Sequence, residues 1–188
     1  MAGSIQAAPG KLNLIQEFVN TYDILNQQEE LTSSEQLHLW FGQRGLLSTD
    51  EQVNEVSWQR TLALREALRV LLMANNGSML DAEVITTLNH LANATHLSVR
   101  FDSNGTAHLE PTVAGVEGAL SHILAIVFAA ISDGTWARLK ACRNPACHYV
   151  FYDYSKNRSG TWCTMAICGN RLKTRTYRRR RQVTKGQA

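Results

Sequence analysis

The feature that most constrains this chain is the spacing of its four cysteines, which all lie in the last quarter of its 188 residues. Cys142 and Cys147 form one pair, and Cys163 and Cys168 form a second pair with the same internal spacing. Two close pairs joined by a short connector are typical of a structural zinc site, in which four thiolates surround one ion tetrahedrally. We therefore expect one structural zinc ion bound by all four cysteines.

Two other uses of four cysteines are disulfides and an iron–sulfur cluster. Residues 1–10 lack the basic start and the apolar run of a secretory signal, so a cytoplasmic location is expected, where disulfides rarely persist. A cluster also takes four thiolates, but the equal spacing of the pairs and their basic surroundings favour zinc. Because four cysteines leave no open coordination position, catalytic zinc is not expected.

Charge divides the chain into two parts. Residues 1–137 hold 6 Lys+Arg and 15 Asp+Glu, a net of −9, whereas residues 138–188 hold 13 Lys+Arg and one acid, Asp153, a net of +12. This asymmetry predicts an acidic domain, residues 11–137, that carries a basic, polyanion-binding module, residues 138–188. We call them the body and the finger. The alternative is that the basic part aids solubility or docks on the acidic body.

The body is predicted to be mainly α-helical with one small β-hairpin. Apolar residues recur at helical spacing from Lys11 to Leu25 and over residues 33–41, 50–74, 81–91 and 113–131. Capping boxes at residues 33–36 and 49–52 mark two of the helix starts, and residues 75–77 mark a helix end. Residues 96–101 and 106–110 alternate like strands around a turn that ends at Gly105.

The body carries no motif of a known catalytic class. It has no glycine-rich phosphate loop, no nucleophile elbow and no H-E-x-x-H pair, so enzyme activity is not expected. The apolar run over residues 123–131 is too short to span a membrane and is interpreted as a buried helix. A helical domain of this kind is expected to bind a small-molecule effector or to form a homodimer.

The finger is predicted to be a zinc-ribbon or treble-clef-like unit that ends in a basic helix over residues 171–181. Residues 149–152 should form a strand, Trp162 should pack beside the metal, Gly169 should form a tight turn, and Asn170 should cap the terminal helix. Tyr154, Trp162 and Tyr177 are aromatic residues of the kind that can stack on bases.

Exposed arginines and lysines favour binding to phosphates, because a guanidinium can donate two hydrogen bonds to one phosphate group. The predicted nucleic-acid contacts are Lys156, Arg158, Arg171, Lys173, Arg175, Arg178, Arg179, Arg180 and Arg181. Most of them would contact phosphate and position the protein without specifying sequence. DNA is the favoured partner. The alternatives are an RNA-binding module, a protein-interaction adaptor that uses the basic tail and, least favoured, an enzyme.

The run from Trp162 to Arg171, W-C-T-M-A-I-C-G-N-R, resembles the signature of the CGNR zinc-finger family. The pair Cys142 and Cys147 and the basic tail also fit that family, which joins its finger to a helical ABATE domain. Residues 18–21 and 64–68 resemble segments of the ABATE domain. The resemblance implies a bacterial, stress-responsive transcription regulator with a structural zinc ion and a nucleic-acid-binding finger.

Overall fold

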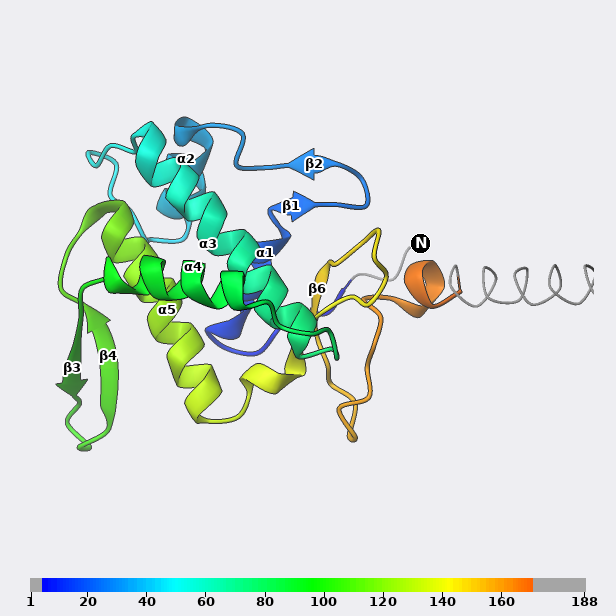
Figure 1. Cartoon of the computed structure of the whole chain (residues 1–188). Coiled ribbons are helices and arrows are strands. Elements are labelled where there is room, and N and C mark those ends of the chain that lie inside the picture. Colours follow the sequence, from blue (N-terminus) through cyan, green and yellow to red (C-terminus); the bar gives the residue numbers. More distant parts are fainter. Residues whose placement is uncertain (1–4, 171–188) are drawn as a thin grey trace, which may run out of the picture.

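The computed structural model describes residues 5–170 and shows a helical body with the finger at one end (Figure 1). The helices are α1 (Leu12–Asn20), α2 (Ser34–Gln43), α3 (Glu55–Ala74), α4 (Ala82–Asn93) and α5 (Gly115–Ser132). Three antiparallel hairpins pair β1 (Tyr22–Asp23) with β2 (Gln28–Glu29), β3 (Leu97–Phe101) with β4 (Ala107–Pro111), and β5 (Leu139–Ala141) with β6 (Val150–Tyr152). The predicted class, mainly α with a small β-hairpin, is confirmed.

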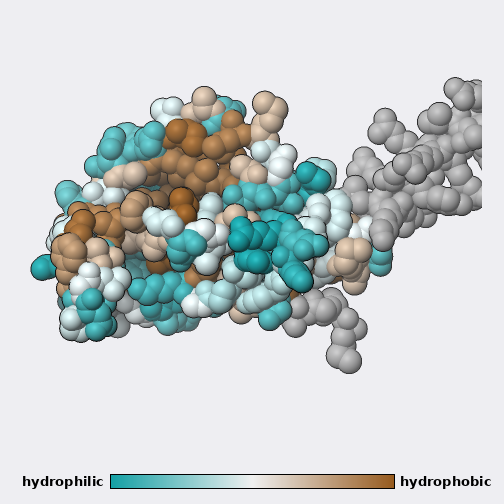
Figure 2. Space-filling view, turned by 90° about the horizontal axis from the view of Figure 1, so that it is seen from below, coloured by the Kyte–Doolittle hydropathy of each residue, from teal (hydrophilic) through white to brown (hydrophobic). Residues whose placement is uncertain are grey.

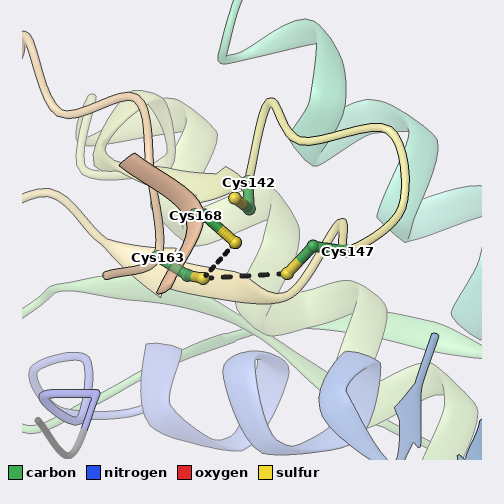
Figure 3. Close-up of side chains that lie close together, drawn as sticks. All are labelled: Cys142, Cys147, Cys163 and Cys168. Carbon is green, nitrogen blue, oxygen red and sulfur yellow. Dashed lines mark hydrogen bonds between the residues drawn. The ribbon is translucent and has the colours of Figure 1, made fainter. Parts of the chain in front are cut away.

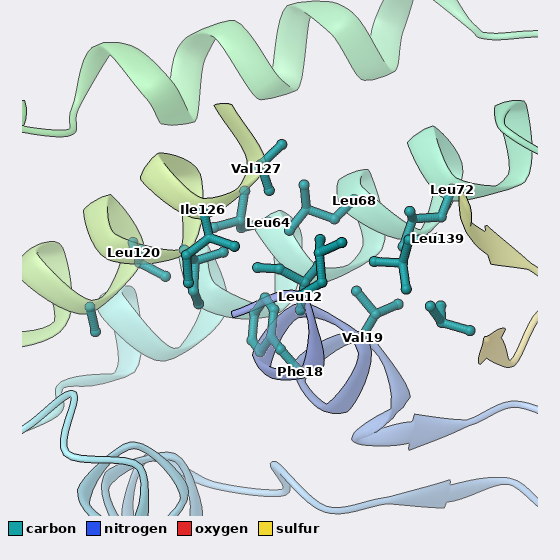
Figure 4. Packing of buried hydrophobic residues seen from close by; sticks show 14 of the residues in the cluster. Leu12, Phe18, Val19, Leu64, Leu68, Leu72, Leu120, Ile126, Val127 and Leu139 are labelled. Carbon is teal, nitrogen blue, oxygen red and sulfur yellow. The ribbon is translucent and has the colours of Figure 1, made fainter. Parts of the chain in front are cut away.

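The core lies where α1, α3 and α5 meet (Figure 4). Phe18 of α1 and Leu64 and Leu68 of α3 are fully buried, and Ile123 of α5 is buried with them. Removing one such side chain typically costs about 2–5 kcal/mol, so this contact fixes the helices relative to one another. The hairpin of β3 and β4 packs against α5 at the end of the molecule away from the finger (Figure 1).

Helix α5 contains the apolar run that was interpreted as a buried helix. Among the described residues it is the one helix that is long and apolar enough to cross a membrane by length and composition alone. More than half of it is buried inside the protein, against α1, α3 and β4. The core helix of a folded domain has the same properties, so the helix is weak evidence for a membrane span.

The first helix ends earlier than predicted, because the next residues form a hairpin. α1 stops at Asn20, and Leu25, which the periodicity placed on its apolar face, lies in the turn between β1 and β2. Arg69 of α3 donates hydrogen bonds to the carbonyls of Val19, at 2.6 Å, and Tyr22, at 3.1 Å. These bonds satisfy carbonyls that the chain leaves open where the helix stops.

The third helix begins later than the capping pattern predicted. α3 starts at Glu55, and Asn54 caps it by accepting the N–H of Ser57 at 2.8 Å. Upstream, Glu51 accepts the backbone N–H and the hydroxyl of Ser48 and holds the chain in a turn. Its other carboxylate oxygen accepts the N–H of Gly115 at the start of α5. The residues of the predicted capping box therefore join two helices instead of starting one.

The finger shares the hydrophobic core of the body. Leu139 and Ala141 of β5 and Val150 of β6 are fully buried in the same cluster as Phe18 and Leu64. β5 packs on α3, and β6 packs on α1. The start of the finger is therefore part of one continuous packed unit.

Candidate metal centre

The four cysteine sulfurs point toward one another from two segments of the finger, residues 142–147 and 163–168 (Figure 3). All four atoms lie within 4.8 Å of one another, and the Sγ atoms of Cys147 and Cys168 are each 3.7 Å from that of Cys163. Zinc–sulfur bonds of about 2.3 Å in a tetrahedron place neighbouring sulfurs about 3.8 Å apart, whereas a disulfide needs about 2.05 Å. The geometry fits one zinc ion, and all four cysteines are free thiols in this structure.

The first pair of cysteines is held by the turn between β5 and β6. The N–H of Cys142 donates to Tyr149 O at 3.0 Å, and the N–H of Cys147 donates to Asn144 O at 2.9 Å. The side-chain amide of Asn144 lies 3.4 Å from the sulfur of Cys168, so it joins the two pairs. Hydrogen bonds of this kind orient ligands and offset the charge of thiolates around a cation.

Of the second pair, Cys168 lies on one short helical turn, Met165–Gly169, and Cys163 lies two residues before that turn. Thr164 caps this turn by accepting the Ile167 N–H at 3.3 Å, and Asn170, which follows the turn, has helical backbone angles. The terminal helix that Asn170 was predicted to cap, residues 171–181, lies outside the described residues. Gly169 does not form a tight turn. A Cβ atom there would lie 2.7 Å from Met165 Sδ and 3.4 Å from Trp162 Cδ1, so glycine permits close packing beside the metal site.

Trp162 contacts the cysteine cluster, as predicted, together with Leu25, Tyr149 and Ile167. Leu25 belongs to the hairpin of β1 and β2, so the body also covers the metal site. Sequence periodicity missed this contact because it placed Leu25 in a helix. The ring of Tyr154, a predicted stacking platform, packs against Tyr152, and its hydroxyl donates to Ala7 O at 2.7 Å.

The thiols affect one another's protonation. Hydrogen bonds with Cys147 and Cys163 lower the pKa of Cys142 to about 2, whereas the bond with Cys142 and burial raise the pKa of Cys147 to about 12. The pKa of Cys163 is raised by the same two neighbours and by burial. A cation must displace protons from thiols of raised pKa, so metal binding at this site is coupled to proton release.

Side chains of the body hold the finger in place. Asn76, just after α3, donates to Ala141 O at 2.8 Å and to Thr161 O at 2.9 Å. Arg69 donates to the carbonyl of His148, the residue after Cys147. His148 has a φ of +50°, and its Nδ1 atom is buried with no hydrogen-bond partner in the part of the chain that the structure describes. No sequence motif signalled these long-range contacts.

Two of the predicted nucleic-acid contacts lie in the described part of the finger. Lys156 and Arg158 are exposed on the connector between the cysteine pairs. Their side chains form no ion pair or hydrogen bond with residues 5–170. The other predicted contacts lie outside the described residues: Arg171, Lys173, Arg175, Arg178, Arg179, Arg180 and Arg181.

The body contains a cavity of about 700 Å³, broadly open to solvent, between the segment after α2 and the start of α5. Leu46, Leu47 and Val113 contribute apolar lining, and Glu51 and His122 contribute polar groups. Burial, followed by the charge of Lys11, lowers the pKa of His122, so its imidazole is neutral at physiological pH. A volume of this size is within the range of small-molecule sites.

A helical body joined to a four-cysteine finger defines a zinc-finger protein. Residues 12–134 match the ABATE model, described as "Putative stress-induced transcription regulator", and residues 138–181 match the CGNR zinc finger. The first match covers more than half of the chain, so the chain belongs to the ABATE family. No curated protein matches it.

Proposed function

We propose that this protein is a zinc-dependent, DNA-binding transcription regulator of the bacterial cytoplasm, in which residues 11–137 form the body and residues 138–188 form the finger. The observation that carries the proposal is a pair of exposed cations, Lys156 and Arg158, on the connector between the two cysteine pairs, neither of which has an ion-pair partner within residues 5–170. The single carboxylate of the finger, on Asp153, is buried against Lys140 at 2.8 Å and is not available to Lys156 or Arg158. Polyanion binding would use such cations and release counterions from the nucleic acid.

The zinc ion has a structural role in this proposal. Four thiolates fill a tetrahedral shell, so the proposal includes no catalytic step. Cys142, Cys147, Cys163 and Cys168 would fix the end of the described chain, from which the basic segment 171–181 continues. Its arginines and Lys173 would contact phosphates of duplex DNA.

The body is proposed to regulate the finger through an effector or a second copy of the chain. The cavity beside Glu51 and His122 supports an effector. Exposed apolar side chains such as Phe101 and Phe128 support a homodimer, and Figure 2 shows that apolar surface gathers on one face.

The test is binding of the zinc-loaded protein to duplex DNA and to RNA of matched length across a salt series. Salt-dependent binding to DNA that is lost when residues 171–188 are removed supports the proposal. Preference for RNA would favour the RNA-binding alternative. If neither is bound at low salt, the proposal is wrong, and a protein partner captured after nuclease treatment would favour an adaptor.

A further inference from the structure

A buried ion pair organises the connector loop, which we define as residues 153–160. The ammonium group of Lys140, on β5, donates to Asp153 Oδ2 at 2.8 Å, Arg158 O at 2.6 Å and Gly160 O at 3.2 Å. The two charged side chains are only 6% and 3% exposed. One cation therefore holds the beginning and the end of the loop together.

Asp153 completes the closure of the loop. Its carboxylate also accepts the N–H groups of Ser155, at 3.0 Å, and Gly160, at 2.7 Å. Burial alone would raise the pKa of Asp153, but the hydrogen bonds from Lys140, Ser155 and Gly160 outweigh it and lower the pKa to about 2. A Cβ atom on Gly160 would lie 2.7 Å from the carboxyl group, so the loop closes only with glycine there.

Replacing a buried ion pair by apolar residues is often neutral or stabilising, so stability alone is a weak reason for this pair. A better reason is the conformation that it imposes. Arg158 has a φ of +53°, a left-handed conformation that costs a residue other than glycine about 1–2 kcal/mol. Arg138 adds hydrogen bonds to Asp153 O at 2.9 Å and Ser155 O at 3.0 Å. The backbone is thus held while the side chain of Arg158 extends into solvent.

Strain of this kind is concentrated at functional sites, where the surrounding structure maintains it. The guanidinium of Arg158 has no bonding partner among residues 5–170, so the described fold gives no reason for an arginine at this position. Lys156 is exposed two residues earlier in the same loop. A fixed loop presents both cations with less loss of conformational freedom on binding than a mobile loop would.

We infer that the connector loop is a preformed phosphate-binding loop in which Lys156 and Arg158 each contact a backbone phosphate of duplex DNA, and that Lys140 and Asp153 are its positioning residues. The inference rests on the proposed function and adds a second contact region, separate from residues 171–181. Such contacts carry no base information and fix the register of the finger on the duplex.

The first test is Arg158→Gly in the full-length, zinc-loaded protein. Glycine adopts a positive φ freely, so thermal stability should be kept or raised. The slope of log Kobs against log salt should become shallower by about 0.9, the value for one phosphate contact on duplex DNA. Lys156→Ala should have the same effect on the slope, and Arg100→Ala should have none. An unchanged slope in both connector variants would overturn the inference.

The second test is Asp153→Asn, which separates positioning from charge. This change makes the finger more positive, so binding by net charge alone would become tighter. If the Lys140–Asp153 pair positions the loop, Asp153→Asn should bind DNA more weakly than the unmodified protein at equal zinc content. Adding Arg158→Gly to this variant should then cause little further loss of DNA affinity. Tighter binding would contradict the positioning role. If the unmodified protein binds neither DNA nor RNA, the proposed function itself fails. DNA binding that is lost without residues 171–188 but is unchanged in the connector variants removes this inference alone.

Discussion

The arginines of the body and those in the described part of the finger have different surroundings. Every arginine of the body lies beside a carboxylate: Arg44 with Glu17, Arg60 with Glu117, Arg65 with Glu29, Arg69 with Glu66, and Arg100 with Glu110. Within the described part of the finger, Arg143 and Arg158 have no such partner. Basic composition alone therefore does not mark a nucleic-acid surface, because a partnered cation is already neutralised. A more useful sign of a nucleic-acid surface is an exposed cation that has no carboxylate beside it in the folded protein.

The comparison also separates structural charge from charge available to a ligand. Arg65 and Arg69 are each only 3% exposed, and both bind backbone or side-chain groups of the first hairpin. Lys140 plays the same structural part in the finger. The buried cations hold segments together, whereas Arg143, Lys156 and Arg158 are exposed and form no ion pair within residues 5–170.

The largest expected effect comes from breaking the metal site. Cys163→Ser should abolish zinc binding and all nucleic-acid binding, because structural zinc contributes about 10–16 kcal/mol in zinc-finger peptides. The body should also melt at a lower temperature, since β5 and β6 belong to its core. Metal analysis, binding and thermal unfolding measure the three effects. Ala166→Ser, an exposed change on the turn that carries Cys168, is the control. Normal metal content and binding in Cys163→Ser would disprove the model.

The next largest effect is expected from replacing a buried arginine of the body, compared with an exposed arginine of the finger. Arg69→Met should lower the free energy of unfolding by about 3–5 kcal/mol, because Glu66 and three carbonyls lose a buried charged partner. Arg143→Met should change it by no more than about 0.5 kcal/mol, because this side chain is exposed. Urea unfolding of both variants measures the two changes in the free energy of unfolding. Equal losses would show that the ion-paired Arg69 and the exposed Arg143 do not differ in their contribution to stability.

A smaller effect is expected at the junction of body and finger. Asn76→Ala removes hydrogen bonds to Ala141 O and Thr161 O and should cost about 1–3 kcal/mol in unfolding free energy. It should also speed the release of zinc to a chelator, because both carbonyls belong to the finger. Asn157→Ala, an exposed change in the connector loop, should alter neither quantity. If zinc release is unchanged in Asn76→Ala, the body does not support the metal site through this contact.

Local patterns predicted the features that depend on local chemistry. Cysteine spacing identified the four metal ligands, and Asp81 caps α4 where the sequence indicated a helix start. Gly105, with a φ of +78°, forms the predicted hairpin turn. In each case, residues close together in the sequence supply the groups that decide the structure.

The missed features depend on partners far away in the sequence. The segment before α3 follows a capping pattern, yet Glu51 bonds to Gly115, 64 residues later. Arg69 of α3 satisfies one carbonyl at the end of α1 and one just beyond it, and Leu25 packs against the cysteines. One signal of the connector loop was available from the sequence. Asp153 is the sole acid among residues 138–188, and a single carboxylate among many cations is expected to have a specific partner.

Acid should weaken zinc binding before it disturbs the connector loop. The raised pKa values of Cys147 and Cys163 mean that zinc must displace protons, so lower pH reduces affinity, by about tenfold per pH unit for each proton released. The lowered pKa of Asp153 keeps the stabilising contribution of its ion pair at pH 5, and that contribution is lost only as the pH falls from about 4 toward 2. Calorimetry in two buffers of different ionisation enthalpy measures how many protons are released when zinc binds. Zinc binding without proton release would contradict the expected loss of zinc affinity in acid.

The smallest expected effect extends the comparison to Arg143, a cation that the sequence did not single out. Arg143 is exposed next to Cys142, and its guanidinium lies over Gly77, where a Cβ atom would be 2.6 Å from Nη2. If unpartnered cations of the finger contact phosphate, Arg143→Ala should make the salt slope of DNA binding shallower by about 0.9 without changing stability. Arg44→Ala, which removes an ion-paired arginine of the body, should leave the slope unchanged. Equal slopes in the two variants would limit the phosphate-binding surface to the connector loop and residues 171–181.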